Sequence, residues 1–295
     1  MLKRRDGAIV IKKTENIGFC SGVRRAIDLA DKLLTQYDKL YVTGELVHNS
    51  YVMKRLFSKG LRLLDKNDMP SGEVCLIQAH GVDPAIRQAL FAKGNEIIDG
   101  TCPIVSRSFE INQKLARQGY QVFVFGKRSH PEMMALKGLV EDIDIIENAD
   151  EIDGTLEGVT GTQSALTAQT TMPRQAFQDL IVTIHRRLKM FDSLLVYNTI
   201  CDATVLREEE IIKASGREQA VLVIGGENSS NTRKLYQLAK ERNENSYLVH
   251  NLAGVKTIEQ NISDCHNVII ASGTSTPMEQ VERIEQYLIT RSVGG

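Results

Sequence analysis

The chain has 295 residues, of which 42% are hydrophobic, and it carries a formal net charge of −1. This composition supports a large folded core, and the balanced charge argues against nucleic acid or an anionic membrane surface as a partner. No run approaches the roughly 20 apolar residues of a membrane span, and the basic start lacks the apolar core of a signal peptide. We therefore expect a soluble, cytoplasmic protein.

Short apolar runs alternate with amphipathic stretches along the whole chain, which is the pattern of βα units that build parallel sheets. Strands are predicted at residues 8–13, 39–44, 73–78, 95–99, 120–126, 158–163, 193–198, 220–226, 247–251 and 267–273. Helices are predicted at residues 23–37, 50–60, 84–94, 105–119, 174–191, 206–216, 232–243 and 277–289. Gly60, Gly94 and Gly119 end three of these helices and predict left-handed stops. The fold class is α/β with mainly parallel sheets.

Three cysteines, Cys20, Cys102 and Cys201, each stand where a predicted strand gives way to a predicted helix. Their comparable spacing suggests three α/β subdomains that direct one thiol each at a common centre. The expected subdomains are residues 9–100, 101–198 and 199–290. Cys75 lies inside a strand run and Cys265 just before one, where a thiol behaves as a small buried hydrophobe.

Metal chemistry is the function that three such thiols favour, because the partial positive charge at a helix start stabilises a thiolate. The chain has no close cysteine pair of the kind typical of structural zinc. A cubane [4Fe–4S] cluster with three protein ligands and one iron open to substrate fits three distant cysteines better. Zinc with a histidine as fourth ligand, three unrelated core cysteines, or one nucleophilic cysteine beside a histidine are the alternatives.

Histidines and small polar side chains follow several predicted strands, at the sheet edge where α/β proteins bind ligands. The members of this group are His48, His80, His130, Ser229, Ser230, Asn231 and Ser275. Loops of this kind at helix starts can hold phosphate oxygens, although capping of the helix is the alternative for each loop alone. Their combination predicts an anion site.

Glu132 is the best candidate for a catalytic acid. Pro131 fixes the turn after His130 and places both polar side chains near the end of a predicted strand. A carboxyl group in a closed cleft has a raised pKa and can hold a proton near neutral pH. An exposed surface glutamate is the alternative.

Nine motifs occur in one order along the chain: GFCSGVRRAI, ELVHNSYV, AHGV, DGTCPIVSR, SHPE, QTT, TICDAT, GGENSSNTRKL and GTSTP. In these motifs the chain resembles the LytB/IspH family of 4-hydroxy-3-methylbut-2-enyl diphosphate reductases over essentially its whole length. The resemblance implies a three-lobed α/β fold around a [4Fe–4S] cluster held by Cys20, Cys102 and Cys201.

The reaction that the resemblance implies is the removal of an allylic hydroxyl group with two electrons and two protons. The products are isopentenyl and dimethylallyl diphosphate, the last step of the non-mevalonate isoprenoid pathway. Electrons would come from an external donor such as ferredoxin or flavodoxin. A cluster enzyme that reduces or dehydrates another small alcohol, or a non-enzymatic metal or phosphate sensor, is the alternative.

The resemblance also implies roles for single residues. It places the diphosphate among His48, His80, His130, Ser229, Ser230, Asn231 and Ser275. It makes Glu132 the proton source, with His130 beside it and Thr170 or Thr171 of the QTT motif near the substrate hydroxyl group.

Some positions differ from the family pattern. They are Gly100, Ser129, Asp202, the run Leu206–Arg207–Glu208, and Glu227. A negative charge at Glu227, beside the Ser-Ser-Asn loop, is unfavourable for diphosphate binding unless the side chain points away.

Overall fold

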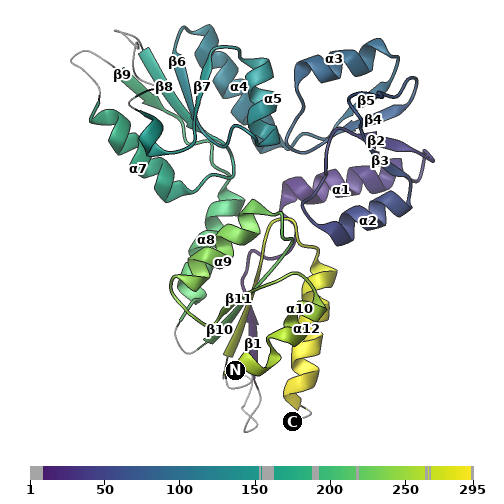
Figure 1. The fold of residues 1–295 in the computed structure, drawn as a ribbon, viewed down its shortest axis with the longest axis vertical. Helices are drawn as coiled ribbons and strands as arrows, with labels where there is room; N and C mark the ends of the chain where they lie inside the picture. The colour runs from purple at the N-terminus through teal and green to yellow at the C-terminus, as the bar shows by residue number, and fades with distance from the viewer. Residues whose placement is uncertain are drawn as a thin grey trace. The chain divides into compact units, whose positions relative to one another are not determined.

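The computed structural model describes residues 9–152, 154, 163–187, 193–216, 219–262, 265 and 267–293. They contain three four-stranded parallel sheets with helices between the strands, which confirms the α/β class (Figure 1). The chain divides into two compact units. The first unit consists of Met1–Arg24, Val47–Arg55 and Asp202–Gly295, and the second of Arg25–Leu46 and Leu56–Cys201.

The sheet of the first unit has the strand order β1-β12-β10-β11. Its strands are β1 (Val10–Lys13), β10 (Gln219–Ile224), β11 (Ser246–Val249) and β12 (Asn267–Ser272). Helices α8 (Asp202–Ala214) and α9 (Ser230–Lys240) pack on one face, where Ile211 and Leu235 contact the side of β10 that carries Val221. The other face packs against α10 (Leu252–Thr257), α11 (Glu259–Ile262) and α12 (Met278–Val293).

Strand β1 belongs to this C-terminal sheet. Val10–Lys13 pairs in parallel with Asn267–Ile270 of β12. The range 9–100, expected as the first subdomain, therefore includes a strand whose partner lies in the range 199–290. The cause is local packing, because Ile11 joins the apolar core on the α12 side of this sheet.

The second unit contains two sheets, with strand orders β3-β2-β4-β5 and β7-β6-β8-β9. The first has β2 (Leu40–Val42), β3 (Leu61–Leu63), β4 (Val74–Ile77) and β5 (Glu96–Asp99). The second has β6 (Gln121–Phe125), β7 (Ile143–Ile146), β8 (Gln163–Ala168) and β9 (Ser193–Val196). Strands β3 and β7 were not expected, because runs of three or four residues give little alternation to recognise. The strand expected at 158–163 lies, apart from Gln163, outside the described residues.

Proline opens three helices of the second unit at the first helical position, where its missing N–H costs nothing. These are α3 (Pro84–Ala92), α4 (Pro103–Arg117) and α5 (Pro131–Leu139). Helix α7 (Arg174–His185) follows β8, and its Phe177 ring stacks on Phe125 of β6. Helices α1 (Ser21–Leu33) and α2 (Ser50–Ser58) contribute residues to both units.

Helix ends follow the sequence prediction where glycine marks them. Gly60, Gly94 and Gly119 all have a positive φ, between 74° and 113°, which confirms the three left-handed stops. Of the helices described, none is both long enough and apolar enough to cross a membrane.

Candidate active site

Glu132 is fully buried in the first turn of α5. Its Oε1 accepts the backbone N–H of Thr170 at 2.9 Å, and its Oε2 accepts the Thr170 hydroxyl at 2.7 Å. Burial raises the pKa of Glu132 to about 7, while the two hydrogen bonds from Thr170 act in the opposite direction. A carboxyl group with this pKa is half protonated near neutral pH and can act as a general acid. The alternative of a surface glutamate is wrong.

Glu132 and Thr170 meet because β6 and β8 are neighbours in one parallel sheet. Phe125 at the end of β6 pairs with Ala168 at the end of β8. Strand β7 intervenes in the sequence but lies on the other side of β6. The chain that leaves β6 toward α5 and the chain that leaves β8 therefore emerge side by side.

Two of the expected pocket histidines lie together in the second unit. His130 caps α5, since its Nδ1 accepts the backbone N–H of Glu132 at 3.2 Å, so the neutral ring carries its proton on Nε2. The ring of His80, which follows β4, meets the His130 ring edge to face with centroids 5.1 Å apart. Gly81 has a φ of +80°, and a Cβ there would lie 2.7 Å from the Phe109 ring, so only glycine allows this course of the loop.

The two threonines of the QTT motif have different partners. Thr170 is buried against Glu132, whereas the Thr171 hydroxyl accepts a hydrogen bond from the Gln169 side chain at 2.8 Å. Gln169 is itself buried, and its Oε1 accepts the backbone N–H of Lys127 at 3.0 Å. The Gln169 side chain thus links the loop after β8 to the loop after β6 by a hydrogen bond, a role that we did not predict.

Two polar loops of the first unit meet beyond the ends of β10 and β12, which pair in parallel. Ser229 caps α9, because its Oγ accepts the backbone N–H of Thr232 at 3.3 Å, while the side chain of Ser230 is exposed. Ser275 is buried in the second loop, whose Gly273 donates to the Ile224 carbonyl at 3.0 Å. The capping alternative therefore holds for Ser229, and it leaves the next N–H groups of α9 available to an anion.

The amide of Asn231 supports a polar ligand at this point. Asn231 is 7% exposed, and neither its amide oxygen nor its amide nitrogen has a hydrogen-bond partner among the described residues. A buried amide without partners costs on the order of 1–3 kcal/mol. A folded protein that retains this cost at a helix N-terminus has a donor ready for a ligand.

His48 belongs to the same unit as these loops. A Cβ on Gly226 would lie 2.2 Å from the His48 carbonyl oxygen, so the turn after β10 touches this segment only because residue 226 is glycine. Asn49 accepts the backbone N–H groups of Tyr51 and Val52 at 3.1 and 3.3 Å and caps α2. The first unit thus brings His48 together with the serine and asparagine loops.

The three candidate cluster ligands share one local setting. Cys20 directly precedes α1, Cys102 is the N-cap of α4 without a side-chain cap bond, and Cys201 directly precedes α8. None of the three takes part in a disulfide, and all three are partly exposed. Cys75, by contrast, is buried, and burial raises its pKa to about 11. The donor set at the helix starts therefore fits a thiolate-bound metal cluster, whereas Cys75 does not.

Backbone bonds tie two of these cysteines to the acid site of the second unit. The N–H of Cys102 donates to the Ala79 carbonyl, next to His80, at 2.9 Å, and the N–H of Cys201 donates to the Thr170 carbonyl at 2.8 Å. Cys20 lies in the first unit. Within the described ranges no three His, Cys, Asp or Glu side chains are grouped as a metal site, so the common centre stays a prediction.

Several residues at or beside the positions that differ from the family pattern have clear structural roles. The side chain of Glu227 is 78% exposed, with its Oε1 3.6 Å from His250 Nε2. Arg207 is buried and donates to the carbonyls of Ser272 and Gly18 at 3.0 and 2.9 Å, which joins the end of β12 to the segment before Cys20. Burial raises the pKa of Glu208 in spite of its contact with Lys234. We did not identify Arg207 from the sequence, although its spacing of four from Ile211 on a buried helix face was the available signal.

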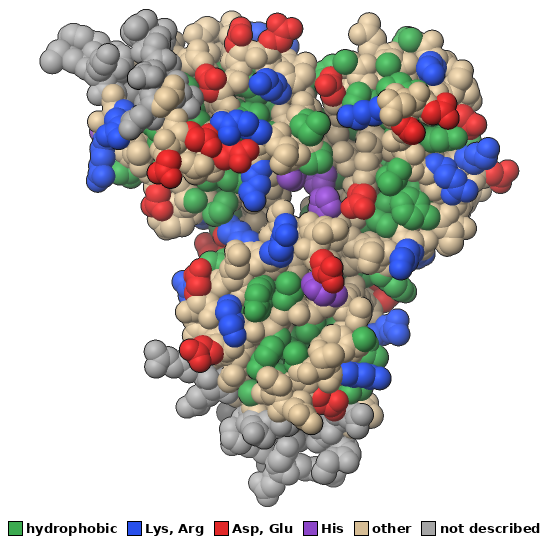
Figure 2. Space-filling view, viewed as in Figure 1, with side chains coloured by type: hydrophobic (Ala, Val, Ile, Leu, Met, Phe, Trp, Pro, Cys, Tyr) green, Lys and Arg blue, Asp and Glu red, His purple; other side chains and the backbone are tan. Residues whose placement is uncertain are grey.

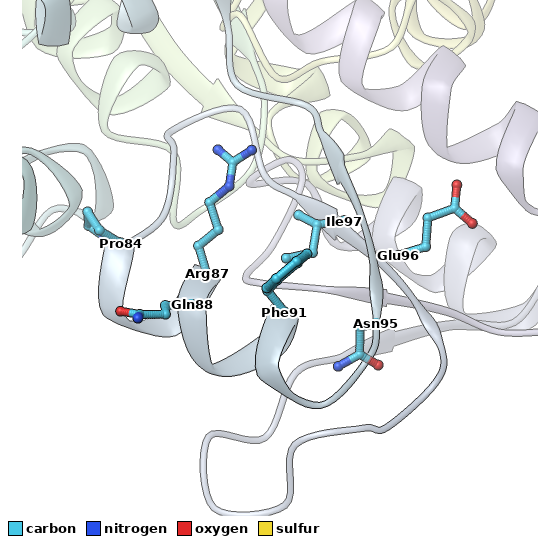
Figure 3. Close-up of a pocket in the computed structure, with 7 residues that line it drawn as sticks. All are labelled: Pro84, Arg87, Gln88, Phe91, Asn95, Glu96 and Ile97. Carbon is cyan, nitrogen blue, oxygen red and sulfur yellow. The ribbon is translucent and has the colours of Figure 1, made fainter.

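The hollow drawn in Figure 3 lies away from these residues. It has a volume of about 560 Å³ and lies between α3 and the start of β5, with Arg87, Phe91 and Ile97 in its wall. Ligand sites of parallel sheets lie at the carboxyl ends of strands, and this hollow lies at an amino end. It contributes nothing to the candidate site.

Comparison with known proteins agrees with these features. Residues 11–289 match the model of a family described as LytB protein. The 4-hydroxy-3-methylbut-2-enyl diphosphate reductase of Petrotoga mobilis is 34% identical over 284 residues, which cover 94% of this chain and 96% of the relative. The reductase of the same name from Aquifex aeolicus is 32% identical over 279 residues, covering 93% and 94%.

Solved structures show the same architecture. One is an (E)-4-hydroxy-3-methyl-but-2-enyl diphosphate reductase described as the terminal enzyme of the non-mevalonate pathway. It superposes with a TM-score of 0.72 and is 30% identical in sequence, and the match covers 96% of this chain and 100% of the solved chain. The E-1-hydroxy-2-methyl-but-2-enyl-4-diphosphate reductase of Plasmodium falciparum shares the fold, with a TM-score of 0.86 and 24% identity over 95% of this chain and 88% of its own.

Proposed function

Because the chain belongs to the LytB family, we propose that it reduces 4-hydroxy-3-methylbut-2-enyl diphosphate to isopentenyl and dimethylallyl diphosphate, the last step of the non-mevalonate pathway. It is an enzyme, an oxidoreductase. The observation that carries the reaction type is the buried Glu132, whose pKa is raised to about 7 by burial. The reduction consumes two protons, one that releases the hydroxyl group as water and one that is added to the allylic carbon chain, and Glu132 is placed to supply one of them.

The diphosphate is bound, in this proposal, by His48, Ser229, Ser230, Asn231 and Ser275 of the first unit and by His80 and His130 of the second. The helix start at Ser229 and the unsatisfied amide of Asn231 support this assignment. The negative charge of Glu227 is compatible with diphosphate binding in this proposal, because its side chain is exposed and lies close to His250.

Cys20, Cys102 and Cys201 would hold the [4Fe–4S] cluster. When bound, it supplies the electrons and a Lewis-acidic iron. The support from this chain is chemical, since the three thiols are outside any disulfide, partly exposed and at helix starts. A reducing compartment keeps such thiols unpaired, and we place the enzyme in the cytoplasm on that ground.

Proton delivery rests on Glu132, Thr170 and His130. The Thr170 hydroxyl lies 2.7 Å from Glu132 Oε2 and can pass a proton from the acid toward a substrate hydroxyl group. Of the two QTT threonines, we therefore assign the substrate contact to Thr170. His130 holds the first turn of α5, and with it Glu132, through the backbone bond at its Nδ1.

We further propose that the electrons come from an acidic carrier such as ferredoxin or flavodoxin, which docks on the exposed face of α4. Arg107, Lys114 and Arg117 are exposed on this helix beside a single acidic residue, Glu110, and Cys102 caps its first turn. On the molecular face in Figure 2, basic and acidic side chains are interspersed, which does not favour nucleic acid as a partner.

The donor proposal is tested by comparing two reductants. Arg107→Glu with Lys114→Glu should slow turnover with the protein carrier about tenfold, because like charges oppose docking, and leave the rate with reduced methyl viologen unchanged. Equal rates with the protein carrier would contradict the docking surface.

The reaction itself is tested with anaerobically reconstituted protein, reduced methyl viologen and the allylic diphosphate. We expect both five-carbon diphosphates as products. A full cluster content without product would favour a cluster enzyme for another small alcohol. Failure with every alcohol, with diphosphate still bound, would favour a sensor.

A further inference from the structure

His250, which follows β11, holds the turn that leads into the Ser-Ser-Asn loop. Its Nδ1 lies 2.7 Å from the Gly225 carbonyl oxygen. A carbonyl oxygen only accepts, so Nδ1 carries the proton and donates it. Gly225 begins the Gly225–Gly226 turn, and Ser229 donates its backbone N–H to Gly226 at 3.2 Å. His250 is thus bonded to the base of the loop that carries Asn231.

Gln280 of α12 joins His250 to the His48 segment. Its Nε2 donates to the carbonyl of His250, and its Oε1 accepts the side-chain N–H of Asn49 at 3.1 Å. Asn49 is buried and directly follows His48. A single side chain therefore connects two parts of the first unit that are far apart in the sequence.

The bonds made by His250 and Gln280 lie on either side of a close contact between the backbones of Gly226 and His48. Gly226 touches the His48 carbonyl so closely that any Cβ at position 226 would collide with it. The His250 bond on the Gly225 side and the Gln280 bond on the Asn49 side set the distance between the two segments.

We propose that His250 and Gln280 are positioning residues for diphosphate binding, which hold the Gly225–Asn231 loop and the His48 segment in one arrangement before the ligand arrives. The inference rests on the proposed function for the identity of the ligand. An anion site that is ordered in advance loses less entropy on binding. These residues therefore act on affinity, while proton delivery by Glu132 is untouched.

The test is His250→Ala, with binding of inorganic pyrophosphate measured by calorimetry and with KM and kcat for the allylic diphosphate. We expect the pyrophosphate Kd and the KM to rise about fivefold, the effect of one lost hydrogen bond, with kcat and the cluster absorbance unchanged. His250→Asn places an amide nitrogen where Nδ1 stood and should restore both constants to within about twofold. His185→Ala, at the exposed end of α7, is the matched control and should change neither.

Gln280→Leu keeps the volume of the side chain but removes both of its bonds, and it should raise the same two constants by a smaller factor. Unchanged constants in His250→Ala and Gln280→Leu would overturn the inference. So would a His250→Asn variant as weak as His250→Ala, because packing rather than the Nδ1 bond would then be the cause. A wild-type protein that binds pyrophosphate without forming product would contradict the proposed function and leave this inference standing.

Discussion

The two units treat their buried polar groups in opposite ways. In the second unit, the Glu132 carboxyl group has both oxygens bonded to Thr170, and the remaining cost of burial appears as a raised pKa. In the first unit, Asn231 is buried with neither amide atom bonded to any described residue. The second unit is therefore built to hold a proton, and the first to receive a ligand. The largest effects on turnover and the largest effects on affinity should accordingly separate between the two units.

Cys102→Ser should have the largest effect, because three protein ligands leave no replacement when one is lost. We expect complete loss of the absorbance at about 400 nm that is typical of such clusters, and of turnover. Cys75→Ser, which alters a buried thiol in the same unit, is the matched control and should keep both. A normal spectrum in Cys102→Ser would remove it from the ligand set.

Glu132→Gln should lower kcat by about 10²–10⁴-fold, the usual contribution of a positioned acid. Glutamine keeps the volume and an acceptor for Thr170 but holds no transferable proton. Pyrophosphate binding should stay within about twofold of wild type, since the Glu132 side chain is not among the groups that bind the diphosphate in this proposal. A variant with near-normal kcat would show that another group is the acid.

Asn231→Leu should raise KM about tenfold by removing a donor to the diphosphate. The same change should raise the free energy of unfolding of the ligand-free protein, because a buried amide without partners is replaced by an apolar side chain of similar volume. Chemical denaturation and steady-state kinetics measure the two effects. Loss of stability together with loss of affinity would mean that Asn231 has a structural role.

The pH dependence of kcat should report the Glu132 carboxyl group. Burial raises its pKa from 4.5 to about 7, so the protonated acid prevails below that pH and kcat falls above it. Thr170→Val removes one of the two bonds that lower this pKa, and the alkaline limb should move up by about 0.5–1 pH unit. An alkaline limb that does not move would exclude Glu132 as the group that titrates.

The same pKa has a consequence for stability. The folded pKa of Glu132 is raised above its ordinary value, so its contribution to stability is complete below about pH 4.5 and is lost as the pH rises through about 7. The difference in unfolding free energy between wild type and Glu132→Gln should change sign or size across this range. Denaturation at pH 5 and pH 8 measures it.

Sequence pattern predicted those parts of the fold that have a strong local signal. The long strands of the first unit and the helices that end at Gly60, Gly94 and Gly119 are present as predicted. Helix α5 was missed because Pro131–Leu139 is short and contains Gly138, and its packing on the sheet overrides its weak propensity.

The site was predictable as a set of residues but not as a set of contacts. Strand ends indicated Glu132 and His130, and the family resemblance indicated the QTT threonines, whereas the Thr170 bond depends on β8 returning beside β6. Sequence order alone does not fix which strands become neighbours. His250 belongs to none of the nine motifs, and only the folded structure connects its two ring nitrogens and its carbonyl oxygen with Gly225, Glu227 and Gln280.

The pairing of β1 with β12 also sets a condition on biosynthesis. During translation β1 leaves the ribosome long before β12. It therefore remains without its pairing partner at a stage when all strands of the second unit have been synthesised and can form their sheets. An unpaired strand is a template for aggregation, and charged side chains are a usual protection. Lys12 and Lys13 are exposed on β1, and we expect their charges to protect the nascent strand until it pairs with β12.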